Sequence, residues 1–259
     1  PLASRADPSV LIDEADFPKC MESALATADW AGFSARKAVA REEGRFIGIG
    51  LAVYLKGSGR GPFEAATVRI GPSGRINVIS GVSAIGQGTR TMLAQIVAQS
   101  LSVELNDIDV VIGDTAAIPY GMGAASSRQT VTAGSSAQAA AVEVRKKALR
   151  VAAHFMETSE HDLEIADGRV HVIGVPGMSM GLGEIATKLA GAATGFALPK
   201  GESPGLEAHV AVQIDGLAFS NGAHVAEVEV DRGTGEVRVL NYVIAHDCGV
   251  MINPLIIDG

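Results

Sequence analysis

Two short stretches of sequence organise the chain: Ile85-Gly86-Gln87-Gly88 and Gly123-Ala124-Ala125-Ser126-Ser127-Arg128-Gln129-Thr130. Each leads directly into a segment with apolar residues at helical spacing, residues 89–101 after the first and 132–155 after the second. The first turn of a helix has unpaired N–H groups and a partial positive charge, which suit an anionic oxygen. Taken by themselves, however, the loops favour the simpler interpretation of tight turns and helix caps.

The composition is that of a globular protein. The chain has 259 residues, of which 47% are hydrophobic and 19% charged, enough for one large domain or two smaller ones. A formal charge of -8 argues against a nucleic-acid partner. The basic cluster of Arg145, Lys146, Lys147 and Arg150 is expected to be solvated on one helix face. No apolar run reaches the roughly 20 residues of a membrane span, and residues 1–7 show no apolar core of a signal peptide. We therefore expect a cytoplasmic protein.

The periodicity predicts an α+β fold, with antiparallel hairpins and mixed sheets packed with helices. A strand over residues 45–56 is expected to be covered on both faces, and Gly71-Pro72-Ser73-Gly74 is expected to close a hairpin. We expect three ranges, a helical lead (1–44) and two halves that divide near Met156 (45–156 and 157–259). The other expected helices are 17–28, 30–43 and 182–190, and the other expected strands are 63–70, 75–80, 107–113, 163–165, 169–172, 207–214, 223–230 and 236–244.

The sequence lacks the motifs that usually identify zinc sites, serine hydrolases and nucleoside triphosphatases. The six histidines show no metal-ligand spacing, and neither a Gly-x-Ser-x-Gly elbow nor a P-loop is present. Cys20 and Cys248 are expected to be buried thiols, and the negative charge of Asp247 disfavours a reactive thiolate at Cys248. The chain begins at Pro1 and stops at Gly259 directly after a turn, so we expect a piece of a longer polypeptide.

Arg128 is the residue with the most specific physical case. Beside two serines and a threonine at a helix start, its guanidinium could add a fork of donors for phosphate oxygens. It could equally tie the loop to a carboxylate. The sequence leaves both interpretations open.

Taken in order, the motifs resemble the molybdenum-binding subunit of the molybdenum hydroxylase family, which includes xanthine dehydrogenases, aldehyde oxidoreductases and aerobic carbon monoxide dehydrogenase-type large chains. The match runs from about Arg45 to Gly259. Its motifs are Gly86-Gln87-Gly88, Gly113-Asp114-Thr115, Pro119-Tyr120-Gly121, Ser126 to Gly134, Pro204 to Ala208, Asp247-Cys248-Gly249 and Ile252-Asn253-Pro254.

The resemblance implies a molybdopterin cofactor with molybdenum, in bacterial members typically the cytosine dinucleotide. Residues 45–156 would form a molybdopterin-binding subdomain, and residues 157–259 a second subdomain truncated at its C-terminal end. The pyrophosphate of such a cofactor agrees with the two helix starts. The positions that match the family's cofactor contacts are Gly86, Gln87, Gly88, Ser126, Ser127, Arg128, Gln129, Thr130, Cys248, Gly249 and Asn253.

The resemblance also implies a reaction and partners. Family members hydroxylate an aldehyde or N-heterocycle with water-derived oxygen, and electrons leave through iron-sulfur clusters and FAD on partner chains. The family's catalytic glutamate lies beyond Gly259, so we expect no catalytic or metal-ligating residue in this chain and no activity of the chain alone. Its expected partners are the rest of the molybdenum subunit, the iron-sulfur and flavin subunits and a small organic substrate. The alternatives are a cofactor-free binding or scaffold module and a phosphate- or nucleotide-binding enzyme that uses the Arg128 loop.

Overall fold

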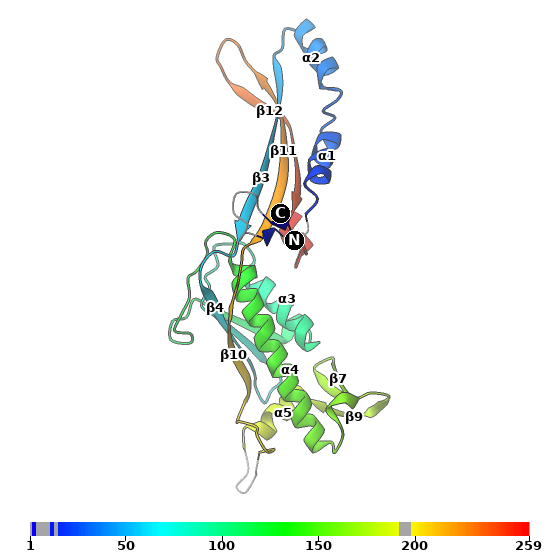
Figure 1. Ribbon diagram of the computed structural model, residues 1–259, viewed down its shortest axis with the longest axis vertical. Coiled ribbons are helices and arrows are strands. Elements are labelled where there is room, and N and C mark those ends of the chain that lie inside the picture. The colour runs from blue at the N-terminus through cyan, green and yellow to red at the C-terminus, as the bar shows by residue number, and fades with distance from the viewer. Residues whose placement is uncertain (1, 4–10, 13–14, 192–197, 259) are drawn as a thin grey trace. The chain divides into compact units, whose positions relative to one another are not determined.

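The computed structural model describes residues 2–3, 11–12, 15–191 and 198–258. It contains two compact units, each built from two separate segments of the chain (Figure 1). Unit 1 comprises residues 1–58 and 216–251, and unit 2 comprises residues 59–215 and 252–259. Within the described residues, we find no helix with the length and apolar character that a membrane span requires.

Unit 1 is built on a three-stranded antiparallel sheet in the order β12 (Val237–Asp247), β11 (Ala218–Val230), β3 (Ile47–Ser58). Helix α1 (Phe17–Thr27) packs on β11 and β12, where Ala24 and Ala28 join Ala223 and Val225 in a small core. Asp16 caps α1 by accepting a hydrogen bond from the Lys19 N–H (3.0 Å). Helix α2 (Phe33–Glu42) contacts β3, and the short strands β1 (Leu2–Ala3) and β2 (Leu11–Ile12) pair with each other.

The main sheet of unit 2 has four strands in the order β10 (Leu206–Gln213), β4 (Phe63–Ile70), β5 (Ile76–Ser80), β6 (Ile108–Ile112). The β4–β5 hairpin closes through residues 71–74, as predicted. Strands β5 and β6 are parallel, so the chain crosses over between them through α3 (Thr89–Leu101). The loop that leaves β5 therefore delivers the chain to the start of a helix, which is the usual position of ligand sites in such units.

Helix α4 (Ser135–Phe155) packs on β4 and β10 and against α3 (Figure 1). A π-helical turn over Thr130–Gly134 precedes it. The alanines and valines predicted to form one stripe are fully buried in the core of unit 2, because their small side chains let the helix approach the sheet closely. They include Ala137, Ala140, Val144, Ala148 and Val151.

The remaining elements of unit 2 form a smaller sheet and two short helices. Strands β7 (Leu163–Ala166), β8 (Arg169–Val172) and β9 (Val175–Gly181) are antiparallel, and α5 (Leu182–Leu189) follows β9. Asp167 and Gly168 both have positive φ angles, as a two-residue hairpin turn requires. Helix α6 (Pro254–Asp258) comes after the chain returns from unit 1, and 3₁₀ turns lie at Leu105–Asp107 and Glu160–Asp162.

The structure confirms the α+β class, but three details of the prediction are wrong. Strand β3 is an edge strand with Leu51, Val53 and Leu55 37%, 63% and 47% exposed, because α1 packs over β11 and β12 instead. Lys147 is buried rather than solvated, and its Nζ donates to the carbonyl and the hydroxyl of Ser203 (3.0 Å each). Cys20 is half-buried and Cys248, in the turn after β12, is exposed.

Strand β9 and helix α6 were not predicted. The compact units also follow other boundaries than the three expected ranges. The boundaries between the units lie at residues 58/59, 215/216 and 251/252. The chain returns to unit 1 because β3 pairs with β11, which lies far along the sequence. Residues 191–205 contain several glycines and two prolines, and the sequence favours an excursion on the surface for them; residues 192–197 of this stretch lie outside the described residues.

Candidate functional site

The first loop reaches α3 through two glycines in left-handed conformations. Gly86 has φ 105° and Gly88, which precedes the first residue of α3, has φ 77°. Residues with a Cβ rarely adopt such angles, so glycine is needed at both positions. A Cβ on Gly88 would also approach Ile256 of α6 to 2.6 Å. The two glycines are therefore explained by the backbone conformation of the loop, with or without a ligand.

The second loop carries strain of a rarer kind. Ser126 and Ser127 have φ angles of 48° and 50°, two successive left-handed residues that are not glycine. Such a conformation costs on the order of 1–3 kcal/mol per residue and persists where the surroundings hold it. The Gly59 N–H donates to the Ser126 carbonyl (3.3 Å), and the Arg128 N–H donates to the Ala125 carbonyl (3.1 Å). Strained loops of this kind are concentrated at functional sites, as are π-helical turns.

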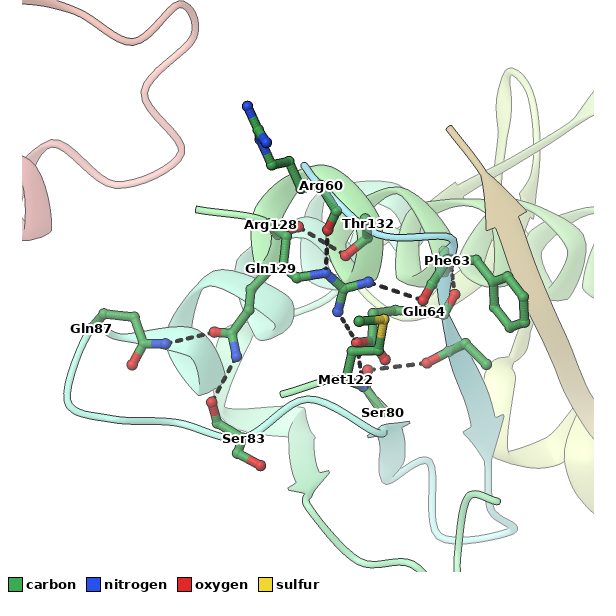
Figure 2. Close-up of polar contacts among 12 residues, drawn as sticks. Arg60, Phe63, Glu64, Ser80, Ser83, Gln87, Met122, Arg128, Gln129 and Thr132 are labelled. Atoms are coloured by element: carbon green, nitrogen blue, oxygen red, sulfur yellow. Dashed lines mark hydrogen bonds and ion pairs between the residues drawn. The ribbon is translucent and has the colours of Figure 1, made fainter. Parts of the chain in front are cut away.

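Glutamine side chains join the two loops. The Gln129 Oε1 accepts a hydrogen bond from Gln87 Nε2, and Gln129 Nε2 donates to the Ser83 carbonyl (2.6 Å each) (Figure 2). The Thr89 hydroxyl also donates to Gln129 Oε1 (2.6 Å). The Ile85 N–H in turn donates to Gln87 Oε1 (2.7 Å). The starts of α3 and of the π-helical turn before α4 are thereby held side by side.

Both loops line one cavity of about 510 Å³. This volume lies within the range of roughly 300–1,000 Å³ that is typical of small-molecule sites. Residues at two helix starts, Thr89 of α3 and Thr130 of the π-helical turn before α4, belong to its wall, and helix N-termini favour negative charge. The wall also offers amide and hydroxyl groups. The lining residues are Ile85, Gln87, Thr89, Met92, Ala124, Ala125, Ser126, Ser127, Arg128, Gln129, Thr130 and Ile257.

Arg128 forms a buried ion pair with Glu64 of β4 (Figure 2). Its guanidinium also donates to the carbonyls of Arg60 (2.7 Å) and Phe63 (3.1 Å), and the residue is 1% exposed. Of the two interpretations of Arg128, the structure therefore supports the tie to a carboxylate. This geometry also removes the sequence argument for a phosphate- or nucleotide-binding enzyme that uses the Arg128 side chain.

The three predicted site residues near the C-terminus are divided between the units. Asn253 belongs to unit 2, where its Oδ1 accepts from the Ile256 N–H at the start of α6 (3.3 Å) and its Nδ2 donates to Gln95 Oε1 (3.0 Å). Cys248 and Gly249 belong to unit 1, in the turn after β12, where the Gly249 N–H donates to Asp247 Oδ1 (3.0 Å). The side chain of Asn253 thus holds α6, whose Ile257 lines the cavity.

Glu64 is the residue of this site that the sequence interpretation missed. Strand β4 reads Phe63-Glu64-Ala65-Ala66-Thr67-Val68-Arg69-Ile70, and Glu64 is in phase with Ala66, Val68 and Ile70, which face the core. An acidic residue in phase with a buried apolar row needs a partner, because an unpaired buried charge is very costly. The position of Glu64 on the core-facing side of the strand pattern was therefore the sequence signal that could have identified it.

A second cavity, of about 480 Å³, lies in unit 1 between α1, β3 and β11. Phe17, Met21, Val53 and Leu55 give it an apolar wall. Burial raises the pKa of Tyr54 in the same wall, and the nearby Cys20 and Cys248 add to this shift. The described residues that line this cavity include the start of one helix, α1, rather than of two, so it is the weaker candidate for an anionic ligand.

A family model described as the molybdopterin cofactor-binding domain matches residues 23–259. The chain belongs to this family. The resemblance to molybdenum hydroxylases, inferred from the ordered motifs, is thereby confirmed.

Relatives of this molybdopterin cofactor-binding domain have names that describe oxidoreductases. The nicotine 6-hydroxylase large subunit of Paenarthrobacter nicotinovorans is 32% identical over 96% of the chain and 32% of its own length. Subunit gamma of the 6-hydroxypseudooxynicotine dehydrogenase complex from the same organism is 36% identical over 95% of the chain and 31% of its own length. Quinoline 2-oxidoreductase from Pseudomonas putida 86 superposes with a TM-score of 0.88 at 33% identity, over 100% of the chain and 34% of its own. The domain thus spans about a third of the length of these relatives.

Proposed function

We propose that the unit 2 cavity holds the phosphorylated part of a molybdopterin cofactor, in the form of the cytosine dinucleotide. The observation that carries this proposal is the convergence of two helix starts on one cavity in a member of the molybdopterin cofactor-binding family. The molybdenum of that cofactor would supply the chemistry for hydroxylating an aldehyde or N-heterocycle with water-derived oxygen. The chain itself would bind and orient the cofactor.

The residues of the cavity fit an anionic group. Gln87, Thr89, Ser126 and Thr130 bring amide and hydroxyl groups, and the described residues that line the cavity include no aspartate or glutamate. Gly86 and Gly88 let the backbone turn with its N–H groups near the ligand. We assign contacts with the cofactor to the lining residues Gln87, Ser126, Ser127, Gln129 and Thr130, together with these glycines.

The other predicted site residues enter this proposal with different roles. Arg128 would act by holding the loop, since its guanidinium is occupied by Glu64 and two carbonyls. Asn253 would hold α6 at the cavity through Gln95. Contacts of Cys248 and Gly249 with the cofactor remain part of the proposal, supported by the resemblance of Asp247-Cys248-Gly249 to the family motif.

We further propose that this domain works as part of an oxidoreductase with several subunits. The relatives are about three times as long, and two of them are named as a large subunit and as a subunit of a complex. The expected partners are the rest of the large subunit and chains that carry iron-sulfur clusters and FAD. Iron, flavin and molybdenum in fixed ratio in the purified complex would support this assembly.

The binding proposal is tested by placing a negative charge in the cavity. Gln87→Glu in the complete enzyme complex is expected to lower the pterin and molybdenum content per large subunit by about tenfold or more, because the new carboxylate and an anionic cofactor would carry like charges in one cavity. Gln99→Glu is the matched control, since Gln99 is exposed on α3 and does not line the cavity. Pterin is measured by fluorescence after release and oxidation, and molybdenum by elemental analysis.

The outcomes separate the alternatives. A wild-type complex that is fully assembled but contains neither pterin nor molybdenum would support a cofactor-free binding or scaffold module. Stabilisation of the complex by a nucleotide alone, without pterin, would support a nucleotide-binding enzyme. Equal cofactor content in Gln87→Glu and Gln99→Glu would place the cofactor outside this cavity.

A further inference from the structure

The ion pair between Glu64 and Arg128 differs from the other ion pairs of the described residues. Glu64 is 0% and Arg128 1% exposed, whereas every other pair in the described part of the chain has at least one side chain that is 33% exposed or more. A buried ion pair often stabilises a fold no better than apolar residues of the same size, because both charges lose their water. The presence of the Glu64–Arg128 ion pair is therefore better explained by the backbone conformation that it fixes than by a gain in stability.

Glu64 connects three parts of unit 2. Its Oε1 accepts hydrogen bonds from Arg128 and from the Met122 N–H (2.8 Å), and its backbone carbonyl accepts from the Ser136 hydroxyl in the first turn of α4 (2.7 Å). Glu64 thereby connects its own strand, β4, to the loop before the second helix start and to α4. Its second carboxylate oxygen, Oε2, is buried without a partner among the described residues, so the pair depends on the single oxygen Oε1.

Arg128 connects this anchor to the strained loop. It directly follows Ser126 and Ser127, which hold left-handed conformations, and its side chain binds the carbonyls of Arg60 and Phe63 at the entry to β4. The adjacent Gly59 N–H donates to the Ser126 carbonyl. Because left-handed serines persist only where neighbours fix them, these bonds are what keeps the loop in its cavity-lining form.

The charge of Arg128 is not available to a ligand. Arg128 is the one ionisable residue among the described residues that line the cavity, and its guanidinium points toward Glu64 while the amide of Gln129 points toward Gln87 (Figure 2). An anion in this cavity would therefore be bound by neutral N–H and O–H groups. This step rests on the proposed function.

We propose that Glu64 and Arg128 are positioning residues, which shape the loop over residues 122–130 for the cofactor and do not bind the cofactor's phosphates themselves. If Arg128 were a phosphate ligand, removal of the competing carboxylate of Glu64 would preserve or strengthen cofactor binding. If the pair positions the loop, loss of either partner weakens binding to the same extent.

The test compares Glu64→Gln, Arg128→Met and the double variant in the complete enzyme complex. Each single variant is expected to lower the pterin content per large subunit by about tenfold or more, because one buried charge loses its partner. The double variant leaves no unpaired charge, so its thermal unfolding midpoint is expected to return close to that of the wild type. Its pterin content is expected to stay low, because the loop remains unanchored.

A matched control is the exposed pair of Arg69 and Glu207, which joins β4 to β10 across the same sheet. Arg69→Met with Glu207→Gln is expected to keep the wild-type pterin content. The inference is overturned if Glu64→Gln keeps its pterin while Arg128→Met loses it, which would identify a direct ligand. It is also overturned if the double variant regains both stability and pterin, which would identify a purely structural pair. A wild-type complex without pterin would refute the proposed function instead.

Discussion

The side chain of Gln129 makes three hydrogen bonds that join the two loops of the site. Removing it would leave the Gln87 amide without its partner, and removing Gln87 would leave a buried acceptor with one donor fewer. We expect Gln87→Ala to lower the free energy of unfolding by about 0.5–1.5 kcal/mol, because Gln129 Oε1 keeps its bond from Thr89, and Gln129→Ala to lower it by about 1–3 kcal/mol. The two losses are expected to be coupled by about 0.5–3 kcal/mol.

Denaturant unfolding of the two single variants and the double variant measures this coupling. Gln99→Ala, on the exposed face of α3, is the control and is expected to change stability by less than about 0.5 kcal/mol. Strictly additive losses would mean that the two glutamines do not support each other.

Lys147 gives a prediction about pH. Burial lowers its pKa below the ordinary 10.5, so between the lowered pKa and 10.5 the unfolded chain binds more protons than the folded chain. The free energy of unfolding contributed by this lysine is therefore expected to rise with pH across that window. Lys147→Met should remove the rise, whereas Lys146→Met, at an exposed neighbour in an ion pair with Glu143, should keep it. Urea unfolding at several alkaline pH values compares the three proteins, and equal slopes in all of them would contradict the prediction.

Residue types at the site were partly predictable. The Gly-Gln-Gly and Ser-Ser-Arg-Gln-Thr loops are visible in the sequence because glycine and hydroxyl residues before a helical pattern have a local cause. The sequence could not decide between the two roles considered for Arg128, because its carboxylate partner lies 64 positions earlier in the chain. The sequence indicated that partner only through the position of Glu64, which lies on the same face of its strand as the buried apolar residues Ala66, Val68 and Ile70.

At the scale of elements, the exit of β5 meets the loop that leads to the second helix start. A Cβ on Gly81 would lie 2.0 Å from the Tyr120 carbonyl oxygen, and one on Gly121 would lie 2.1 Å from the Gly81 carbonyl oxygen. Two backbones cross here with no side chain between them. Gly81→Ala and Gly121→Ala are each expected to cost about 1–3 kcal/mol of stability or more, because neither backbone can move freely.

Thermal unfolding checks this prediction, and Gly177→Ala in β9 is its control. A Cβ there would meet no atom within 4 Å, and its backbone lies outside the left-handed region. Wild-type stability of Gly81→Ala would show that the crossing can open at little cost.

Elements with local signals were predicted better than elements without them. Helix α3 and strand β4 were predicted with the bounds that the structure gives them. Strand β9 contains a proline and two glycines, which disguise a strand, and α6 has only five residues and no periodicity. The β3–β11 pairing was beyond prediction, because nothing local links two strands so far apart.

At the scale of the whole molecule, a bound cofactor would protect the backbone segments that contact it. We expect removal of the cofactor from the complex to accelerate amide hydrogen exchange in residues 85–90 and 124–131, because their N–H groups would lose a ligand. The paired strands β4 and β5 should be unaffected. Mass spectrometry of the loaded and the emptied complex measures this, and faster exchange at residues 247–250 would support the proposed contacts of Cys248 and Gly249. Unchanged exchange in both loops would argue against cofactor binding there.

The interleaving of the two units has a consequence for synthesis on the ribosome. Strand β3 ends at residue 58, but its neighbour β11 begins at residue 218, after nearly all of unit 2. At ordinary translation speeds this interval lasts on the order of ten seconds. Throughout this interval the nascent chain carries a twelve-residue strand, apolar from Leu51 to Leu55, without β11, and unpaired strands of this kind tend to pair with other chains. Most of unit 2 is synthesised in this interval, and the sheet of unit 1 cannot close before β11 has followed it, so β3 is the strand that a chaperone would have to protect.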